Sequence, residues 1–300
     1  MTNEPMHTSA GAVFSSWGFP AAISLLAFAA NSILCRLALA GGNIDPESFT
    51  AIRLVSGALF LVCLIRLRQP VTALGGSWRG GLSLFFYAYL FSLAYLELEA
   101  GAGALILFGA VQITMFVFGW LKGEFLRLQV VLGMLVGFTG LVVLLLPSDN
   151  APPLISALVM MASGIAWGAY SVIGKGSENP LADTTGNFVR SLPMMLAAWI
   201  LLGGETHITS AGSMYALGSG VLASGAGYSI WYAVVKRISA QQAATLQLSV
   251  PVLASFAGVV LLSEPMTWRM FLSSAVVLGG IAIAVIPLRQ RVADSPDLGR

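Results

Sequence analysis

The chain has 300 residues, of which 57% are hydrophobic and only 9% are charged, and its formal net charge is +2. An ordinary soluble domain carries about 25% charged residues, so the composition excludes a soluble protein and predicts an integral membrane protein. Because the basic residues are spread over the predicted loops, the small positive charge gives no reason to expect nucleic-acid binding.

Ten segments are long and apolar enough to cross a bilayer. A spanning helix needs about 20 mainly apolar residues, since a rise of 1.5 Å per residue must cross about 30 Å of hydrocarbon. The predicted helices are 17–40, 46–66, 79–97, 101–121, 128–146, 153–174, 184–203, 212–235, 241–262 and 268–287. The residues before the first helix contain no Lys or Arg, so we do not expect a cleaved signal peptide. The predicted class is all-α integral membrane.

The second half of the sequence repeats the first. Residues 166–175, AWGAYSVIGK, match residues 27–36, AFAANSILCR, at an offset of 139. Five further markers recur 137 to 140 residues later, namely Arg53 and Arg190, Tyr95 and Tyr232, Glu124 and Glu264, Gly140 and Gly280, and Pro147 and Pro287. Because the register persists over more than a hundred residues, the chain is predicted to be two copies of one unit.

The linker 147–153, PSDNAPP, divides the two copies. We expect a first five-helix repeat over 1–148, a second over 149–290 and a disordered polar tail over 291–300. Since five is an odd number, the second repeat enters the membrane in the opposite orientation. The predicted fold is therefore ten transmembrane helices in two inverted five-helix repeats around a central cavity, with the substrate site near the bilayer midplane.

The basic residues predict the orientation. With the N-terminus in the cytoplasm, eleven of the 15 Lys and Arg fall on the cytoplasmic side, and the outer side holds Arg269 and at most Arg36 besides. The positive-inside rule therefore predicts that both termini are cytoplasmic.

Ionisable residues are scarce inside the predicted helices. All 13 Asp and Glu, and both His, lie in loops, in tails or in the last turn of a helix. Proton relays in transporters use carboxylates or histidines within the membrane, so we expect no obvious proton coupling. The two cysteines, Cys35 and Cys63, lie in predicted helices and show no metal-binding spacing, so neither a metal nor a cofactor is predicted.

Two arginines, Arg53 and Arg190, lie well inside predicted helices. An arginine at the bilayer centre costs about 3 kcal/mol on insertion scales. Each is expected to anchor its helix or to pair with a loop carboxylate, or alternatively to contact the substrate. Glu124 and Glu264 each precede the last helix of a repeat, where a carboxylate stabilises a helix N-terminus.

Polar and aromatic side chains recur at helical spacing on six predicted helices. Such stripes are typical either of packing through small residues or of a wettable cavity, and their presence on six helices favours the cavity. The predicted substrate-binding residues are Phe28, Asn31, Tyr87, Phe91, Tyr95, Gln112, Trp167, Tyr170, Ser171, Tyr228, Trp231, Tyr232 and Ser249.

Pro251 lies inside the ninth predicted helix, in SVPVLASF. Proline removes a backbone hydrogen bond and bends a helix, which a membrane protein tolerates where a cavity or neighbour satisfies the freed carbonyl. We therefore predict a kink or gate at Pro251. The first repeat has Val111 at the corresponding position, so the two repeats are expected to differ in stiffness.

Each repeat ends in a Glu, an amphipathic entry, a Gly-containing helix and a Pro, in GEFLRLQVVLGMLVGFTGLVVLLLP and SEPMTWRMFLSSAVVLGGIAIAVIP. With the ten spans, the arginine of each second helix and the Pro251 segment, the sequence resembles the EamA group of the drug/metabolite transporter superfamily over about residues 17–288. The resemblance implies a central cavity lined by the first, third, fourth, sixth, eighth and ninth helices. Val111 departs from the pattern, because related repeats often have proline there.

The resemblance also implies a small-molecule substrate, since the superfamily includes exporters of aromatic and other amino acids and carriers of drugs and metabolites. We predict a multi-pass protein of the bacterial inner membrane that exports amino acids and related small metabolites. An exporter of drugs or hydrophobic cations is an alternative, but it should need a buried carboxylate. A membrane-embedded enzyme would need a convergent catalytic set, which the sequence lacks, and a receptor role is a further alternative. The sequence predicts no oligomeric state.

Overall fold

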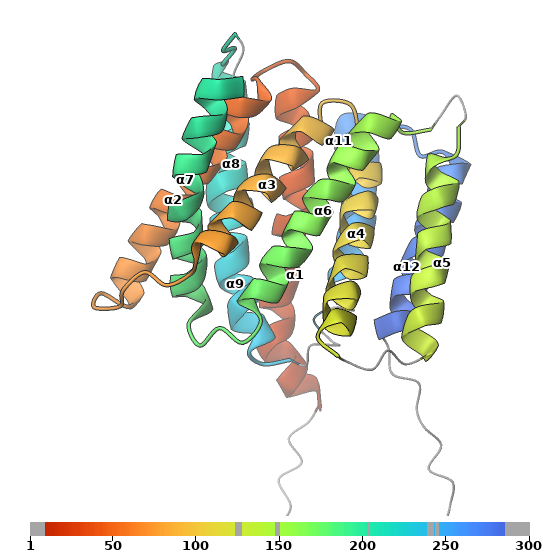
Figure 1. The fold of residues 1–300 in the computed structure, drawn as a ribbon, viewed down its shortest axis with the longest axis horizontal. Helices are drawn as coiled ribbons and strands as arrows, with labels where there is room; N and C mark the ends of the chain where they lie inside the picture. The colour runs from red at the N-terminus through yellow and green to blue at the C-terminus, as the bar shows by residue number, and fades with distance from the viewer. Residues whose placement is uncertain are drawn as a thin grey trace, which may run out of the picture.

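The computed structural model describes residues 10–123, 128–147, 151–202, 205–238, 243 and 246–285. These residues form a bundle of helices that run up and down side by side (Figure 1). In chain order the helices are α1 (Ala10–Leu39), α2 (Pro46–Arg68), α3 (Trp78–Ala94), α4 (Ala100–Leu121), α5 (Leu128–Leu145), α6 (Leu154–Gly174), α7 (Pro180–Leu202), α8 (Ser210–Gly218), η1 (Ser219–Ala226), α9 (Gly227–Val235), α11 (Ser249–Leu262) and α12 (Trp268–Val285). Because α8, η1 and α9 are continuous, we call them together the α8–α9 helix, and the described residues then contain ten helices.

Six of the described helices are long and apolar enough to cross a membrane. They are Trp17–Leu39 within α1, together with α2, α4, α5, α6 and α7. The protein is therefore a multi-pass membrane protein. The remaining helices coincide with predicted segments, although α3 ends at Ala94, three residues before its predicted end. The predicted start of the ninth segment and the predicted tail of 291–300 lie outside the described residues.

Side-chain caps fix several helix starts. Asp45 accepts a hydrogen bond from the Ser48 backbone N–H and is followed by Pro46, whose missing N–H costs nothing at the first helical position. Ser77 caps α3 through the Gly80 N–H in the same way. These caps allow the connections to stay short, which brings consecutive helices into an antiparallel arrangement.

A π-helical stretch, η1, lies in the middle of the α8–α9 helix. Its sequence, SGVLASGA, is rich in glycine and serine, and the wide turn brings it close to α2. A Cβ atom at Gly220 would collide with the Arg53 carbonyl oxygen and the Ser56 hydroxyl, so glycine is required for this approach. π-Helical turns often mark functional sites, and this one faces the centre of the bundle.

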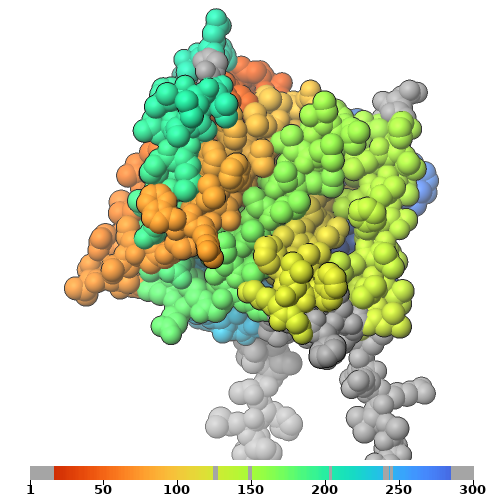
Figure 2. Space-filling model, viewed as in Figure 1, coloured from red at the N-terminus to blue at the C-terminus, as the bar shows by residue number. Residues whose placement is uncertain are grey.

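The two halves of the chain interlock. In the first half, α1 packs on α11 and on the α8–α9 helix, while α2 packs on α7 and η1. In the second half, α6 packs on α3 and α4, while α7 packs on α2 and α3. Figure 2 shows the result on one face, where α6 (green) lies between α3 (orange) and α4 (yellow). Within the described residues, the predicted repeats over 1–148 and 149–290 therefore do not pack as two separate units.

The helices α5 and α12 form a peripheral pair at one edge of the bundle (Figure 1). Their backbones approach so closely that a Cβ atom at Gly133 would lie only 2.5 Å from the Gly280 carbonyl oxygen. Gly140 likewise leaves room for Val277. Small residues allow such close helix packing in a bilayer, where no hydrophobic driving force holds helices together. The other eight described helices surround the centre of the molecule, where the candidate site lies.

Candidate functional site

A cavity of about 520 Å³ lies at the centre of the bundle. This volume falls within the range of about 300–1,000 Å³ that is typical of small-molecule sites. Its inner wall is formed by Phe28, Asn31, Ser32, Tyr87, Phe91, Leu107, Phe108, Val111, Gln112, Trp167, Tyr170, Ser171, Ala223, Tyr228, Trp231 and Tyr232. Both halves of the chain contribute to this wall, because α1, α3 and α4 alternate with α6 and the α8–α9 helix.

Aromatic rings form a continuous cluster along the wall, with Trp167 at its centre. The Trp167 ring centroid lies 4.5 Å from that of Tyr87, 5.2 Å from Tyr170 and 5.3 Å from Tyr228. Phe28 continues the cluster on the other side, 5.6 Å from Tyr228. Such clusters offer flat apolar faces to a ring and electron-rich faces to a cation.

Neutral hydrogen-bonding groups interrupt this aromatic wall. The Tyr170 hydroxyl donates to the Thr184 Oγ1 at 3.4 Å, and the Thr184 hydroxyl donates to the Tyr232 Oη at 3.0 Å. Asn31 accepts a hydrogen bond of 2.6 Å from the Ser219 hydroxyl and donates one of 3.4 Å to the Tyr87 Oη. These networks hold the rings in place and leave polar atoms at the cavity surface.

The cavity extends to the end of the bundle where α4 and α6 end and α7 begins. There its lining includes Lys122, Lys175, Ser177 and Asp183. Asp183 accepts hydrogen bonds from the Gly76 N–H and the Ser177 hydroxyl, so its carboxylate is already engaged. Among the described residues this end also carries Arg66, Arg68, Arg79, Lys236 and Arg237.

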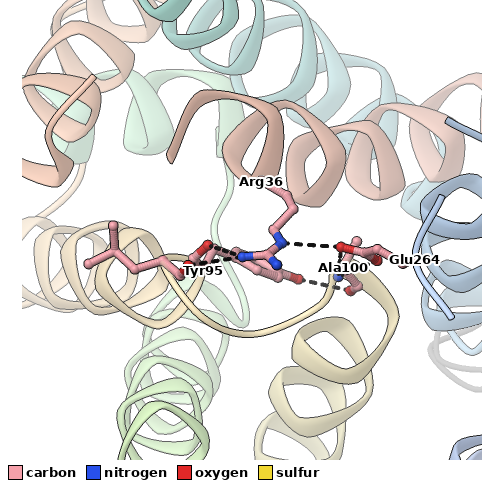
Figure 3. A network of polar contacts seen from close by, with 5 residues as sticks. Arg36, Tyr95, Ala100 and Glu264 are labelled. Carbon is pink, nitrogen blue, oxygen red and sulfur yellow. Dashed lines mark hydrogen bonds and ion pairs between the residues drawn. The ribbon is translucent and has the colours of Figure 1, made fainter. Parts of the chain in front are cut away.

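The opposite end is closed by an ion pair between the two halves (Figure 3). The Arg36 Nε, in the last turn of α1, donates to the Glu264 Oε1 at 3.2 Å. The Arg36 Nη1 also donates to the Tyr95 and Leu96 carbonyl oxygens at 3.2 and 3.0 Å. Glu264 accepts hydrogen bonds of 3.1 and 2.9 Å from the Ala100 N–H. We call this network the closed end.

Glu99 lies beside the closed end, immediately before α4. Its own burial, and then the nearby Glu264 carboxylate, raise the pKa of Glu99, while the Arg36 guanidinium opposes the shift. The charged form of Glu99 is therefore disfavoured in the arrangement seen here.

The structure brings together most of the predicted binding residues and leaves two apart. The cavity is lined by Phe28, Asn31, Tyr87, Phe91, Gln112, Trp167, Tyr170, Ser171, Tyr228, Trp231 and Tyr232. Tyr95 does not line it, because its side chain is fully buried at the end of α3 and its hydroxyl donates to the Ala100 carbonyl oxygen. The placement of Tyr95 in the cavity was therefore wrong.

Ser249 was also placed wrongly. Its hydroxyl donates to the Leu246 carbonyl oxygen at 2.7 Å, and the lining on this stretch comes from Ala243 and Gln247 instead. The residue 140 positions earlier, Gly109, does not line this cavity either and lies against Leu141 instead. Pro251 lies in the first turn of α11 and lacks the N–H that would bond to the Gln247 carbonyl. Its gating role stays a prediction.

The sequence reasoning missed the contribution of α7. Asp183, Thr184 and Asn187 line the cavity from its first two turns. The signal was the polar pair Thr184 and Asn187 at helical spacing within the predicted segment 184–203, which the predicted stripes did not include.

The two helix arginines differ in their surroundings. Arg190 donates a hydrogen bond of 2.5 Å to the Gly75 carbonyl oxygen, which is an anchoring contact. Arg53 is only 2% exposed and pairs with no carboxylate within the described part of the chain. Glu264 stabilises the start of α4 and pairs with Arg36 rather than capping α12, and Glu124 lies outside the described residues.

A helical multi-pass protein with a central cavity, open at one end and closed at the other by a polar network, has the architecture of a membrane transporter. The comparisons with known proteins agree. The EamA-like transporter family matches residues 154–286. The chain is 49% identical over 272 residues to a Pseudomonas aeruginosa protein described as "Uncharacterized protein PA1977", covering 90% of this chain and 95% of that one.

More distant relatives extend over nearly the whole length. A "Probable amino-acid metabolite efflux pump" of Salmonella typhimurium is 25% identical over 91% of this chain and 96% of its own. A crystal structure of a protein at 22% identity superposes with a TM-score of 0.63 over 88% of this chain and 96% of that chain, which shows a shared fold. The chain belongs to the EamA-like transporter family and is a transporter rather than an enzyme.

Proposed function

We propose that this protein exports amino acids, aromatic ones included, and related small metabolites across the bacterial inner membrane. The observation that carries the proposal is the cavity of about 520 Å³, with its cluster of rings around Trp167 and its neutral hydrogen-bonding groups. The name of the Salmonella typhimurium relative supports the same substrate class.

We further propose that the two sequence repeats form an inverted pair that works by alternating access. The helix contacts support this arrangement. The ten described helices are counted in chain order, with the α8–α9 helix as one, and the count returns to α1 after α12. A shift of five helices then turns the contact of α1 with α11 into that of α6 with α4. The contact of α2 with η1 becomes that of α7 with α3, and α5 with α12 is exchanged with itself. An inverted repeat can adopt two such states by rocking one set of helices against the other.

The orientation follows from the charge at the two ends. In the described residues the end where the cavity opens carries a concentration of Lys and Arg, whereas the closed end carries Arg36 and Arg269. By the positive-inside rule the cavity then opens to the cytoplasm, ready to load a substrate for export. The closed end is the outer gate in this proposal.

The drug or hydrophobic-cation alternative has less support. It calls for a buried counter-charge, and Asp183, the described carboxylate that lines the cavity, is already bound by Gly76 and Ser177. It lies in the first turn of α7, at the end of the bundle where α4 and α6 end.

Counterflow in proteoliposomes tests the function. Vesicles that contain purified protein and are loaded with unlabelled phenylalanine, tryptophan, leucine or threonine are diluted into the same labelled amino acid. We expect accelerated exchange for the aromatic amino acids over empty vesicles. If no amino acid exchanges while a labelled quaternary ammonium compound does, the alternative is correct and our proposal is wrong.

A further inference from the structure

Arg53 is a cation buried in the bundle, and no carboxylate of the described residues pairs with it. Its Nη2 donates to the Tyr87 Oη at 3.2 Å and its Nε to the Ser224 Oγ at 3.4 Å, while its Nη1 is buried without a hydrogen-bond partner. Within the residues that the structure describes, Arg53 forms no ion pair. A buried charge is strongly unfavourable unless it is paired, and ionisable residues inside a membrane are functional candidates.

Packing alone does not account for this arrangement. The Arg53 guanidinium carbon lies 5.2 Å from the ring centroids of both Tyr87 and Phe91, and such contacts offset part of the burial cost. Rings and hydroxyls, however, supply no negative charge. The corresponding Arg190 of the second half is only partly buried and bonds to a loop carbonyl, so an anchoring role there needs no ligand.

Tyr87 connects Arg53 to the cavity. The Tyr87 Oη accepts hydrogen bonds from Arg53 and from the Asn31 side chain, and both Tyr87 and Asn31 line the cavity. A phenol has one proton and two lone pairs, so these two bonds occupy the lone pairs. The Tyr87 hydroxyl is also hydrogen-bonded to the neighbouring Tyr228 hydroxyl, so its proton is available to Tyr228 or to a ligand that displaces it. A donor that is polarised by a cation makes a stronger hydrogen bond to an anion.

We propose that the Tyr87 hydroxyl and the Arg53 guanidinium behind it form the subsite that receives the carboxylate of an amino-acid substrate. This inference rests on the proposed function and adds a selectivity to it. The substrate carboxylate lies beside Tyr87 and supplies the charge that Arg53 lacks, while the substrate side chain lies against Trp167 and Tyr228. The cavity then favours amino acids and other aromatic carboxylates over the amines that lack the carboxyl group.

Three ligands with the same ring separate the contributions. Purified protein in detergent is titrated with tryptophan, with indole-3-propionate, which lacks the amino group, and with tryptamine, which lacks the carboxyl group. We expect the wild type to bind the two carboxylates at least about tenfold more tightly than tryptamine, because hydrogen bonds to charged groups have effects of about tenfold or more. Arg53→Met and Tyr87→Phe should each remove this preference without weakening tryptamine, and Arg53→Lys should restore part of it.

Arg190→Met is the matched control and should leave the preference unchanged. Melting temperatures of all variants are measured without ligand. Since Arg53 forms no ion pair with a described residue, Arg53→Met should not lower the melting temperature, whereas loss of an anchoring arginine should. If Arg53→Met lowers the melting temperature but leaves the carboxylate preference intact, the subsite is refuted while the proposed function stands. If none of the three ligands binds the wild type, the proposed function itself is wrong.

Discussion

The ion pair at the closed end allows a quantitative test of alternating access. The change is Glu264→Gln, which removes the negative charge opposite Arg36 and keeps an oxygen that can accept from the Ala100 N–H. The Arg36 and Glu264 side chains are only 18% and 11% exposed, so solvent screens the pair weakly. A charge-assisted hydrogen bond contributes about 1.5–3 kcal/mol, and a loss of about 2 kcal/mol shifts the equilibrium toward an open outer end about 30-fold.

The assay is the rate at which a membrane-impermeant thiol reagent, added outside intact cells, modifies a cysteine in the cavity. Ser32→Cys is suitable because Ser32 lines the cavity one turn before Arg36. The native Cys35 and Cys63 are first replaced by alanine. The labelling rate should rise about 10- to 30-fold when Glu264→Gln is added.

Arg269→Gln provides the matched control. Arg269 lies at the same end and donates to the Val143 carbonyl oxygen at 2.9 Å, outside the closed-end network. Its replacement should leave the labelling rate unchanged. If Glu264→Gln folds normally and labels no faster than its parent, the ion pair does not hold the outer end closed, and the gating argument fails.

Three further predictions follow from the site and the closed end. Trp167→Ala should reduce transport of aromatic amino acids about two- to tenfold more than that of small ones, since each ring contact contributes about 0.5–1.5 kcal/mol. Trp199→Ala, at a side chain 42% exposed on α7, should not change the substrate profile. The reverse result would mean that the rings only pack. Because the pKa of Glu99 is raised in the closed arrangement, protonation of Glu99 stabilises that arrangement. This stabilisation is complete below the ordinary carboxyl pKa and is lost as the pH rises through the raised pKa. Labelling of Ser32→Cys should therefore slow, relative to the same protein carrying Glu99→Gln, as the pH falls from neutral toward the ordinary carboxyl pKa. Equal slowing in both proteins would exclude Glu99 as the cause. Counterflow should run at full rate without a pH difference across the vesicle membrane, and many-fold accumulation driven by an inward proton gradient would contradict this expectation.

The sequence by itself was sufficient for the helices and for most of the cavity wall. Apolar length determines which segments can lie in a bilayer, so the predicted segments and the observed helices coincide closely. Helical spacing determines which residues share a face, so Trp167, Tyr170 and Ser171 could be grouped before their neighbours were known. This reasoning failed at Ser249, because helical spacing groups residues on a face without showing which face is turned to the cavity.

Only the tertiary structure decided which distant groups meet. Arg36 and Glu264 are separated by 228 residues, and nothing local in either segment indicates that they pair across the closed end. Arg53 and Arg190 look alike in sequence, yet Arg190 bonds to a loop carbonyl, whereas Arg53 is buried beside Tyr87 and pairs with no carboxylate among the residues that the structure describes. Local sequence fixes periodicity and burial tendency, whereas ion pairs, unpaired charges and the ends of a cavity depend on how helices from the two halves interlock.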